Sequence, residues 1–343
     1  MEHAAIDLGR PYSVVCYLEG DRKVIRRFRL DRAGLDRLFK DRGRCRVLVE
    51  ACTESEWVAR HLEDLNHEVI VGDPNFEPMY IERNRRVKTD TRDADALFEA
   101  NRLGIYRPAH RRSDARQDVI ELLATRDSLV RTRARWTNHM RAMLRRRGWR
   151  VPSGTPEKFF DRVGALGLAK ELVSPLEPYR ALWLKLNEQI EELEGKLEQI
   201  AGDDAEMELV QTAPAFGVVT SAAAVAVIDD ARRFRKAHQV ESYLGLVPAE
   251  WSSSEQRRRG SITKRGDTRI RWLFVEAAQR VLRSGRPECR ELRRWAETIA
   301  ARRGKKVATV ALARRLAGIV WAMLRTGKPF DPTKLNRGLK AAA

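Results

Sequence analysis

The feature that most constrains the fold of this chain is a set of short, strand-like apolar runs within its first 72 residues. Helical stretches near 31–41 and 55–66 separate the later runs. The expected strands lie at 3–8, 12–18, 23–30, 45–50 and 68–72. A strand-rich start followed by alternating helix and strand predicts an α/β domain built on a central sheet.

Four carboxylates accompany these elements. Asp7 ends the run A-A-I-D, and Glu50 ends the run V-L-V-E. Asp90 and Asp93 lie three residues apart at the expected start of a helix, so they share one helix face. The sequence therefore predicts a cluster of four carboxylates. Divalent cations such as Mg²⁺ take oxygen ligands, and pairs of such ions assist displacement at phosphorus in nucleic acids.

The order of the elements is compatible with the ribonuclease H-like fold, in which carboxylates of the first and fourth strands meet over a central sheet. Asp95 lies off the face that Asp90 and Asp93 share, so we expect it on the helix surface. Acids at strand ends and helix caps are also common without a metal, which is the alternative interpretation of the four carboxylates.

Positive charge is confined to one part of the chain. Residues 1–110 hold 20 Lys and Arg against 20 Asp and Glu, whereas residues 111–343 hold 46 against 28, a net charge of +18. This distribution predicts a polyanion-binding surface in the second part, next to a neutral part that carries the acidic cluster. The alternative is a soluble protein that is merely basic.

Composition argues against several other classes of protein. The sequence has no apolar run of 18 residues and no secretory leader, so we expect a cytoplasmic protein without a membrane span. The cysteines lack C-x-x-C spacing and the histidines lack zinc-binding spacing. We expect small, buried, reduced cysteines at positions 16, 45, 52 and 289.

Two long helices are expected in the middle of the chain, a basic one at 115–148 and an acidic one at about 179–201. The second carries a coiled-coil stripe, with apolar residues in steps of four and three, at Leu186, Ile190, Leu193, Leu197 and Ile200. Its antiparallel partner is either the basic helix of the same chain or the equivalent helix of another subunit. We expect a homo-oligomer, either a dimer or a tetramer.

The predicted domains are 1–110, a long helical coiled-coil middle at 111–205, and a mainly α-helical domain at 206–335. Within the last, A-P-A-F-G-V-V-T at 213–220 resembles the hairpin of a helix-hairpin-helix unit, whose backbone amides bind phosphate. Simple helix packing is the alternative for that segment.

A serine-rich segment precedes a dense basic stretch. Residues 252–254 are all serine, and we expect the chain to be loop-like from there to a helix near Thr268. Cations of this stretch are expected to contact phosphates, namely Arg257, Arg258, Arg259, Lys264 and Arg265. A serine becomes a nucleophile toward phosphorus only if it is activated and the charge on phosphorus is neutralised.

Several motifs, taken together in this order, resemble the transposases of the insertion-sequence one-ten family. They are I-D-L-G at 6–9, V-E-A at 49–51, K-T-D-T-R-D-A at 88–94, G-L-V-P-A-E-W-S-S at 245–253, R-R-x-G-S-I-T-K-R-G-D at 257–267 and L-R-T-G-K-P-F-D at 324–331. The resemblance implies a bacterial DNA recombinase with an N-terminal RuvC-like DEDD domain and a C-terminal transposase domain.

The resemblance also implies roles for individual residues. Asp7, Glu50, Asp90 and Asp93 would form the DEDD tetrad and bind Mg²⁺, and Ser253 would be the nucleophile, ahead of Ser252 and Ser254. It implies a phosphoserine intermediate, donor and target DNA, and a structured noncoding guide RNA. Two other functions stay open: a RuvC-like nuclease or junction resolvase without a serine intermediate, and a non-catalytic nucleic-acid-binding protein.

Overall fold

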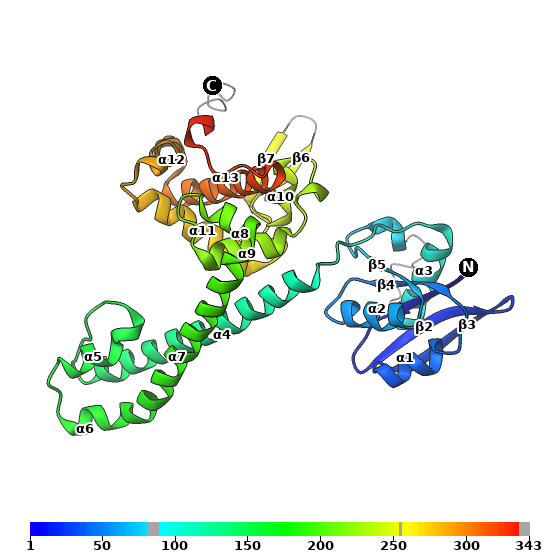
Figure 1. Ribbon diagram of the computed structural model, residues 1–343, viewed down its shortest axis with the longest axis horizontal. Helices are drawn as coiled ribbons and strands as arrows, with labels where there is room; N and C mark the ends of the chain where they lie inside the picture. The colour runs from blue at the N-terminus through cyan, green and yellow to red at the C-terminus, as the bar shows by residue number, and fades with distance from the viewer. Residues whose placement is uncertain (81–88, 254–255, 336–343) are drawn as a thin grey trace. The chain divides into compact units, whose positions relative to one another are not determined.

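Figure 1 shows the computed structural model, which describes residues 1–80, 89–253 and 256–335, with only the backbone described between 251 and 259. Contacts divide the chain into two units, Met1–Arg112 and Ser113–Ala343. The segments 111–205 and 206–335 therefore fall almost wholly within the second unit.

The first unit is built on a five-stranded sheet in the order β3-β2-β1-β4-β5. Its elements are β1 (Glu2–Asp7), β2 (Tyr12–Glu19), β3 (Arg22–Arg29), α1 (Arg32–Phe39), β4 (Cys45–Glu50), α2 (Ser55–Asp64), β5 (Glu68–Gly72), the 3-10 helix η1 (Glu77–Tyr80) and α3 (Asp90–Leu103). β2 is antiparallel to both β1 and β3, whereas β1, β4 and β5 are parallel. These elements confirm the expected α/β domain, including all five strands and both early helices.

Helices cover both faces of this sheet, because successive strand residues point to opposite faces. On one face, Ala4 and Ile6 of β1 pack with residues of α1 and α2. On the other face, Ala5 of β1 and Leu48 of β4 pack with residues of α3. Burial on both faces explains why β1 and β4 read as nearly continuous apolar runs.

The second unit begins with two long helices, α4 (Asp114–Arg146) and α7 (Glu177–Gly202), which confirm the expected helices and lie side by side (Figure 1). Leu186, Ile190 and Leu197 of the apolar stripe are buried. Arg126 of α4 pairs with Glu194 of α7, and Arg133 donates a hydrogen bond to Asn187 at 3.0 Å. In this structure, therefore, the basic helix of the same chain packs against α7.

The remainder of the second unit is mainly helical, as expected. Between α4 and α7 lie η2 (Pro156–Lys158), α5 (Phe159–Gly164), α6 (Lys170–Val173) and η3 (Ser174–Leu176). After α7 come α8 (Ala205–Gln211), α9 (Val218–Ile228), η4 (Ala231–Arg233), α10 (Ala237–Tyr243), α11 (Thr268–Arg283), η5 (Pro287–Cys289), α12 (Arg290–Arg303) and α13 (Lys305–Thr326). α9 is buried from Thr220 to Ile228 and lies in the main hydrophobic core of this unit.

One helix in the described part of the chain, α13, is long and apolar enough to cross a membrane by length and composition. Its buried side, which includes Leu312, Leu316 and Val320, packs in the core of the second unit. A buried core helix passes the same test, so this helix alone is weak evidence for a membrane span.

Two expectations need correction. The segment expected to be loop-like before Thr268 contains a two-stranded antiparallel sheet, β6 (Pro248–Ser253) with β7 (Gln256–Ile262). Pairing of these two strands satisfies backbone groups that a loop would leave to water. Cys16, Cys45 and Cys289 are buried as expected, but Cys52 is exposed.

Candidate active site

The four sequence-predicted acids line one cavity of about 660 Å³ in the first unit, which we call the acid cavity. Asp7, Glu50, Asp90 and Asp93 come from the ends of two strands and the first turn of one helix. Leu8, Gly9, Arg10, Tyr12, Val14, Arg27, Pro74 and Tyr80 complete the lining. The structure thus brings together four residues that are spread over 87 positions of the sequence.

The sheet places the first two acids at the same edge. β1 and β4 are parallel neighbours, and Ile6 pairs with Val49 immediately before Asp7 and Glu50. Because parallel strands end at one edge of a sheet, both carboxylates leave the sheet at adjacent positions. This edge is a usual position for functional groups in α/β proteins.

Asn101 fixes α3 against these strands. Its Nδ2 donates to the carbonyl oxygens of Ala4 at 2.7 Å and Arg46 at 2.8 Å, so it ties α3 to β1 and β4. From Asn101 back to Asp93 the helix rises about 12 Å, and β1 advances about 10 Å from Ala4 to Asp7. Because these distances along α3 and along β1 are similar, the first turn of α3 lies at the edge that carries Asp7 and Glu50.

The local environment suits negative charge. Asp93 is buried, with 7% of its surface exposed, whereas Asp90 is exposed. Both lie in the first turn of α3, where the helix dipole stabilises anions. The Tyr80 hydroxyl donates a hydrogen bond to Glu50 Oε2 at 2.5 Å, which orients that carboxylate.

The donor set fits a hard divalent cation, because the four acids offer only carboxylate oxygens. Within residues 1–80, 89–253 and 256–335, however, no three His, Cys, Asp or Glu side chains form a group that could hold a metal ion as they stand. Asp95 lies outside the lining and pairs with Lys23 at 2.7 Å, which confirms it as a surface residue.

Two lining residues of the acid cavity that the sequence did not predict, Tyr12 and Arg27, lie against each other. The Arg27 guanidinium lies 4.4 Å from the centroid of the Tyr12 ring, and both residues line the cavity. A cation and an aromatic ring beside a set of carboxylates can contact the phosphate and base of a nucleotide. Only the pairing of β2 with β3 brings them together, so neither residue stands out in the sequence.

The predicted nucleophile ends β6 in the second unit. The backbone of Ser253 pairs with Gln256, Ser252 with Arg257, Trp251 with Arg258 and Glu250 with Arg259. The register therefore places the predicted arginines on the strand that faces the serines. Ser254 and the side chains from 251 to 259 lie outside the described part of the chain.

Lys264 and Arg265 follow β7 in an anchored turn, and both are exposed. Gly245 and Gly266 have positive φ, and a Cβ on either glycine would meet backbone atoms of the facing segment at 2.2 Å and 2.3 Å. The buried Arg271 donates to the carbonyl oxygens of Leu244 at 3.3 Å and Arg265 at 2.8 Å. The turn is thus held by buried contacts while its two cations face solvent.

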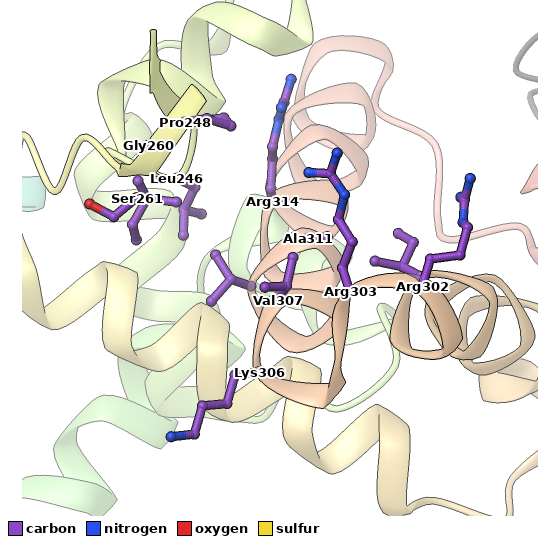
Figure 2. Close-up of a pocket in the computed structure, with 13 residues that line it drawn as sticks. Leu246, Pro248, Gly260, Ser261, Arg302, Arg303, Lys306, Val307, Ala311 and Arg314 are labelled. Atoms are coloured by element: carbon purple, nitrogen blue, oxygen red, sulfur yellow. The ribbon is translucent and has the colours of Figure 1, made fainter. Parts of the chain in front are cut away.

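A second cavity, of about 810 Å³, lies between the base of this hairpin and helices α12 and α13; we call it the hairpin groove. Gly260 and Ser261 line it at an irregularity in the β6–β7 register. In Figure 2, Val307 and Ala311 lie opposite Leu246 and Ser261. Among the described residues, its lining contains the cations Arg302, Arg303, Lys306 and Arg314 and no carboxylate, although Arg314 pairs with Glu241 outside the lining.

Comparison with known proteins defines the class of protein. The family described as "Transposase IS116/IS110/IS902 family" matches residues 207–294, and a second family, described as "Transposase" and named for the DEDD transposases of IS110, matches residues 4–147. The first match contains the β6–β7 hairpin that carries Ser253, which we call the serine hairpin, and the second match contains all four acids. The chain is therefore a transposase, an enzyme that cleaves DNA and transfers its strands.

Two relatives that match over nearly their whole length are also described as transposases. The chain is 29% identical to a probable family 20 transposase of Pseudomonas aeruginosa, over 97% of this chain and 99% of the relative. It is 28% identical to the transposase for insertion sequence element IS1328 of Yersinia enterocolitica, over 95% of this chain and 97% of the relative. The chain belongs to the IS110/IS116/IS902 family of transposases.

Proposed function

We propose that this transposase excises and inserts its element through a phosphoserine intermediate formed on Ser253. The observation that carries its metal-assisted chemistry at phosphorus is the acid cavity, because three separate elements direct four carboxylates to one place. The domain that holds this cavity would be RuvC-like, with a ribonuclease H-like fold, as its sheet order and the family match suggest.

Asp7, Glu50, Asp90 and Asp93 would hold Mg²⁺, which supplies positive charge to the phosphoryl oxygens when it is bound. Tyr80 keeps Glu50 oriented. In the reaction, a bond forms between Ser253 Oγ and phosphorus as one phosphodiester P–O bond breaks. The serine loses its proton and the released deoxyribose hydroxyl gains one. The serine ester retains the energy of the broken bond, so the strands can be rejoined without another energy source.

The second unit would hold the nucleic acids, which are donor DNA, target DNA and a structured noncoding guide RNA. Its net charge and the hairpin groove support this role, since the described lining of the groove has four cations, of which only Arg314 pairs with a carboxylate, Glu241. Backbone-directed cations suit an RNA–DNA duplex, which a protein reads by shape. Arg257, Arg258, Arg259, Lys264 and Arg265 would contact phosphates near the bond that is cut.

We further infer that the α4–α7 pair is an antiparallel coiled coil, and that the enzyme works as a dimer or tetramer in the bacterial cytoplasm. Two leucines of α7 outside the buried stripe, Leu182 and Leu184, are exposed. Such residues suit contact with another subunit. Light scattering with nucleic acid present tests this, and an active monomer contradicts it.

A second candidate function is a RuvC-like nuclease or junction resolvase. The acid cavity is formed wholly by residues of the first unit, so hydrolysis by activated water would need no serine from the second. The two functions differ in one product, because only the serine route leaves a covalent bond between protein and DNA.

The test is denaturing electrophoresis of labelled DNA incubated with the protein, guide RNA and Mg²⁺. We expect a protease-sensitive, slowly migrating DNA species with the natural chain and none with Ser253→Ala. Ser252→Ala and Ser254→Ala are matched controls that should retain the adduct. An adduct with Ser253→Ala would exclude Ser253 as the nucleophile, and free cleaved ends without any adduct would favour the nuclease.

A further inference from the structure

An exposed basic and aromatic cluster lies where α4 ends. We call Arg145, Arg146, Arg147, Trp149 and Arg150 the arm tip, because they lie at or just after the end of α4. In Figure 1 this end of α4 lies near α5 and α6. All five are exposed, and 39% of the Trp149 surface is accessible. A large exposed aromatic residue among four arginines is unusual for a surface that only solvates a helix end.

The arginines of the arm tip differ from most of those earlier in α4. Arg116 pairs with Asp204 and Glu206, Arg126 pairs with Glu194, and Arg133 pairs with Glu157. By contrast, the described residues contain no carboxylate partner for any of the four arginines of the arm tip. Arg135, earlier in α4, also has no carboxylate partner among the described residues, so what sets the helix end apart is that its unpaired arginines are grouped together.

The arm tip rests on a folded support. Gly148 has a positive φ of 83°, and the Trp149 amide donates to the Leu144 carbonyl at 3.0 Å, which closes α4 with a Schellman-type cap. Arg141 donates to the carbonyl of Val151 at 2.6 Å, so the returning chain is held against α4. Beneath it lies a small hydrophobic core that includes Leu144, Phe159 and Trp183.

Nearby groups add to the uncompensated charge. Nε and Nη2 of Arg162 are buried and have no hydrogen-bond partner among the described residues. Burial, followed by the charges of Arg162 and Arg145, lowers the pKa of Arg141. A neighbouring cavity of about 310 Å³ is lined by Arg146 and Arg147, with Glu171 the one carboxylate among its described lining residues.

The dipole of α4 explains only part of this cluster. A helix C-terminus favours cations by about 0.3–1 kcal/mol each, within the last turn. That effect gives no reason for Arg150, which lies beyond the helix, or for an exposed tryptophan beside it. Cations that follow a phosphate backbone and an aromatic ring that stacks on a base require both kinds of residue.

We propose that the arm tip binds a nucleic-acid strand that carries unpaired bases, with phosphates on the four arginines and one base stacked on Trp149. The ligand chemistry is a phosphodiester backbone with an accessible base, whether in RNA or in DNA. The inference rests on the proposed function only in that the chain binds nucleic acid; it needs neither the serine intermediate nor the acid cavity.

The test measures binding of the full chain to labelled single-stranded RNA, single-stranded DNA and blunt duplex DNA over a series of salt concentrations. Trp149→Leu should weaken binding to the single strands about tenfold and leave duplex binding within about twofold. Comparison of the affinities for single-stranded RNA and single-stranded DNA identifies the preferred strand. Trp272→Leu, the same change at an exposed tryptophan of α11, should change neither.

The combined variant Arg145→Gln, Arg146→Gln, Arg147→Gln and Arg150→Gln should reduce the salt slope for single strands by about three units. Its control removes the same charge elsewhere on the arm through Arg131→Gln, Arg135→Gln, Lys185→Gln and Lys196→Gln. The proposal would be overturned if the salt slope fell equally in both variants. It would also be overturned if Trp149→Leu weakened duplex binding as much as single-strand binding.

Two further outcomes keep the inference separate from other roles. If the tip variants bind all three nucleic acids normally but change the oligomeric state in light scattering, the arm tip is a protein interface and the proposal is wrong. If Ser253→Ala retains the DNA adduct while the tip variants lose single-strand binding, the proposed nucleophile fails and the arm-tip site stands. Unchanged thermal unfolding of the variants excludes misfolding.

Discussion

The acid cavity and the serine hairpin are built in opposite ways. The cavity collects residues from β1, β4 and α3 on the edge of a sheet with helices on both faces. The hairpin consists of neighbouring residues on two paired strands, joined to the helical part of its unit by a few anchoring contacts. Changes in distant core residues should therefore affect the cavity, whereas the hairpin should respond mainly to its anchors.

Charge follows the same division. The part that contains the cavity is neutral, and the remainder carries the whole excess of +18. If tetrad carboxylates lay within a strongly basic surface, arginines would compete for them with a metal ion. Under the proposed function, separate units would allow one to keep carboxylates for a cation while the other binds polyanions.

The largest expected effect lies in the cavity itself. Asp93→Asn should lower strand cleavage by on the order of 10³-fold, because it removes a negative charge from the proposed metal site. Nucleic-acid binding should stay unchanged, since the basic unit is untouched. Asp95→Asn is the matched control, because Asp95 lies two residues away on the same helix but outside the cavity. Similar losses in both variants would contradict the assignment.

The second largest effect is expected at Asn101, which holds α3 against the strands beside the acid cavity. Asn101→Ala removes two hydrogen bonds to strand carbonyls and should destabilise the first unit by about 2–3 kcal/mol. Hydrogen–deuterium exchange should speed up in β1, β4 and α3. Asn187→Ala, in the second unit, should leave exchange in those elements unchanged. Unchanged exchange in the Asn101 variant would show that packing alone holds α3 in place.

These two residues show what the sequence can and cannot reveal. Asp93 was predictable, because its spacing from Asp90 at a helix start is visible in the chain. Asn101 was not, because a polar residue inside a helix gives no signal that its amide will meet two strands. The strands β1 and β4 were predictable from their apolar runs, since burial on both faces leaves a local pattern.

The strand β7 was not predicted, because it has no local sequence pattern typical of a strand. Its sequence Q-R-R-R-G-S-I has no alternation of apolar and polar residues, so only its pairing with β6 makes it a strand. The hairpin groove was also invisible, because Leu246, Ser261 and Val307 meet only in the folded chain. Tertiary contacts that join distant polar segments leave no periodicity to read.

Substitution of Arg271, which anchors the turn after the hairpin, should destabilise the protein less than substitution of Asn101. Arg271→Ala removes the bonds to Leu244 and Arg265 and should destabilise the turn by about 2 kcal/mol. Exchange should rise between residues 244 and 267 but not in the first unit. Arg280→Ala, an exposed change on the same helix, is the control. If exchange rises throughout α11 instead, Arg271 supports the helix rather than the turn.

Orientation of one cavity carboxylate should have a modest effect. Tyr80→Phe removes the hydroxyl that donates to Glu50, worth about 1 kcal/mol, so cleavage should fall about fivefold. Substrate affinity should not change, because the carboxylate remains. Tyr106→Phe, outside the cavity lining, serves as the control. A loss as large as that of Asp93→Asn would give Tyr80 a direct part in the chemistry.

The smallest effect concerns single phosphate contacts beside the hairpin. Lys264 and Arg265 are exposed on a turn whose backbone is fixed by Gly245, Gly266 and Arg271, so neutralising either should not alter the fold. Lys264→Gln or Arg265→Gln should each reduce the salt slope of duplex binding by about one unit, the amount expected for one lost phosphate contact. Arg283→Gln, an exposed cation near the end of α11, is the control. An unchanged slope in both hairpin variants would move the main duplex contact away from this turn. Because the salt slope changes by about one unit for each phosphate contact that is lost, it can detect a contact whose effect on cleavage is too small to measure.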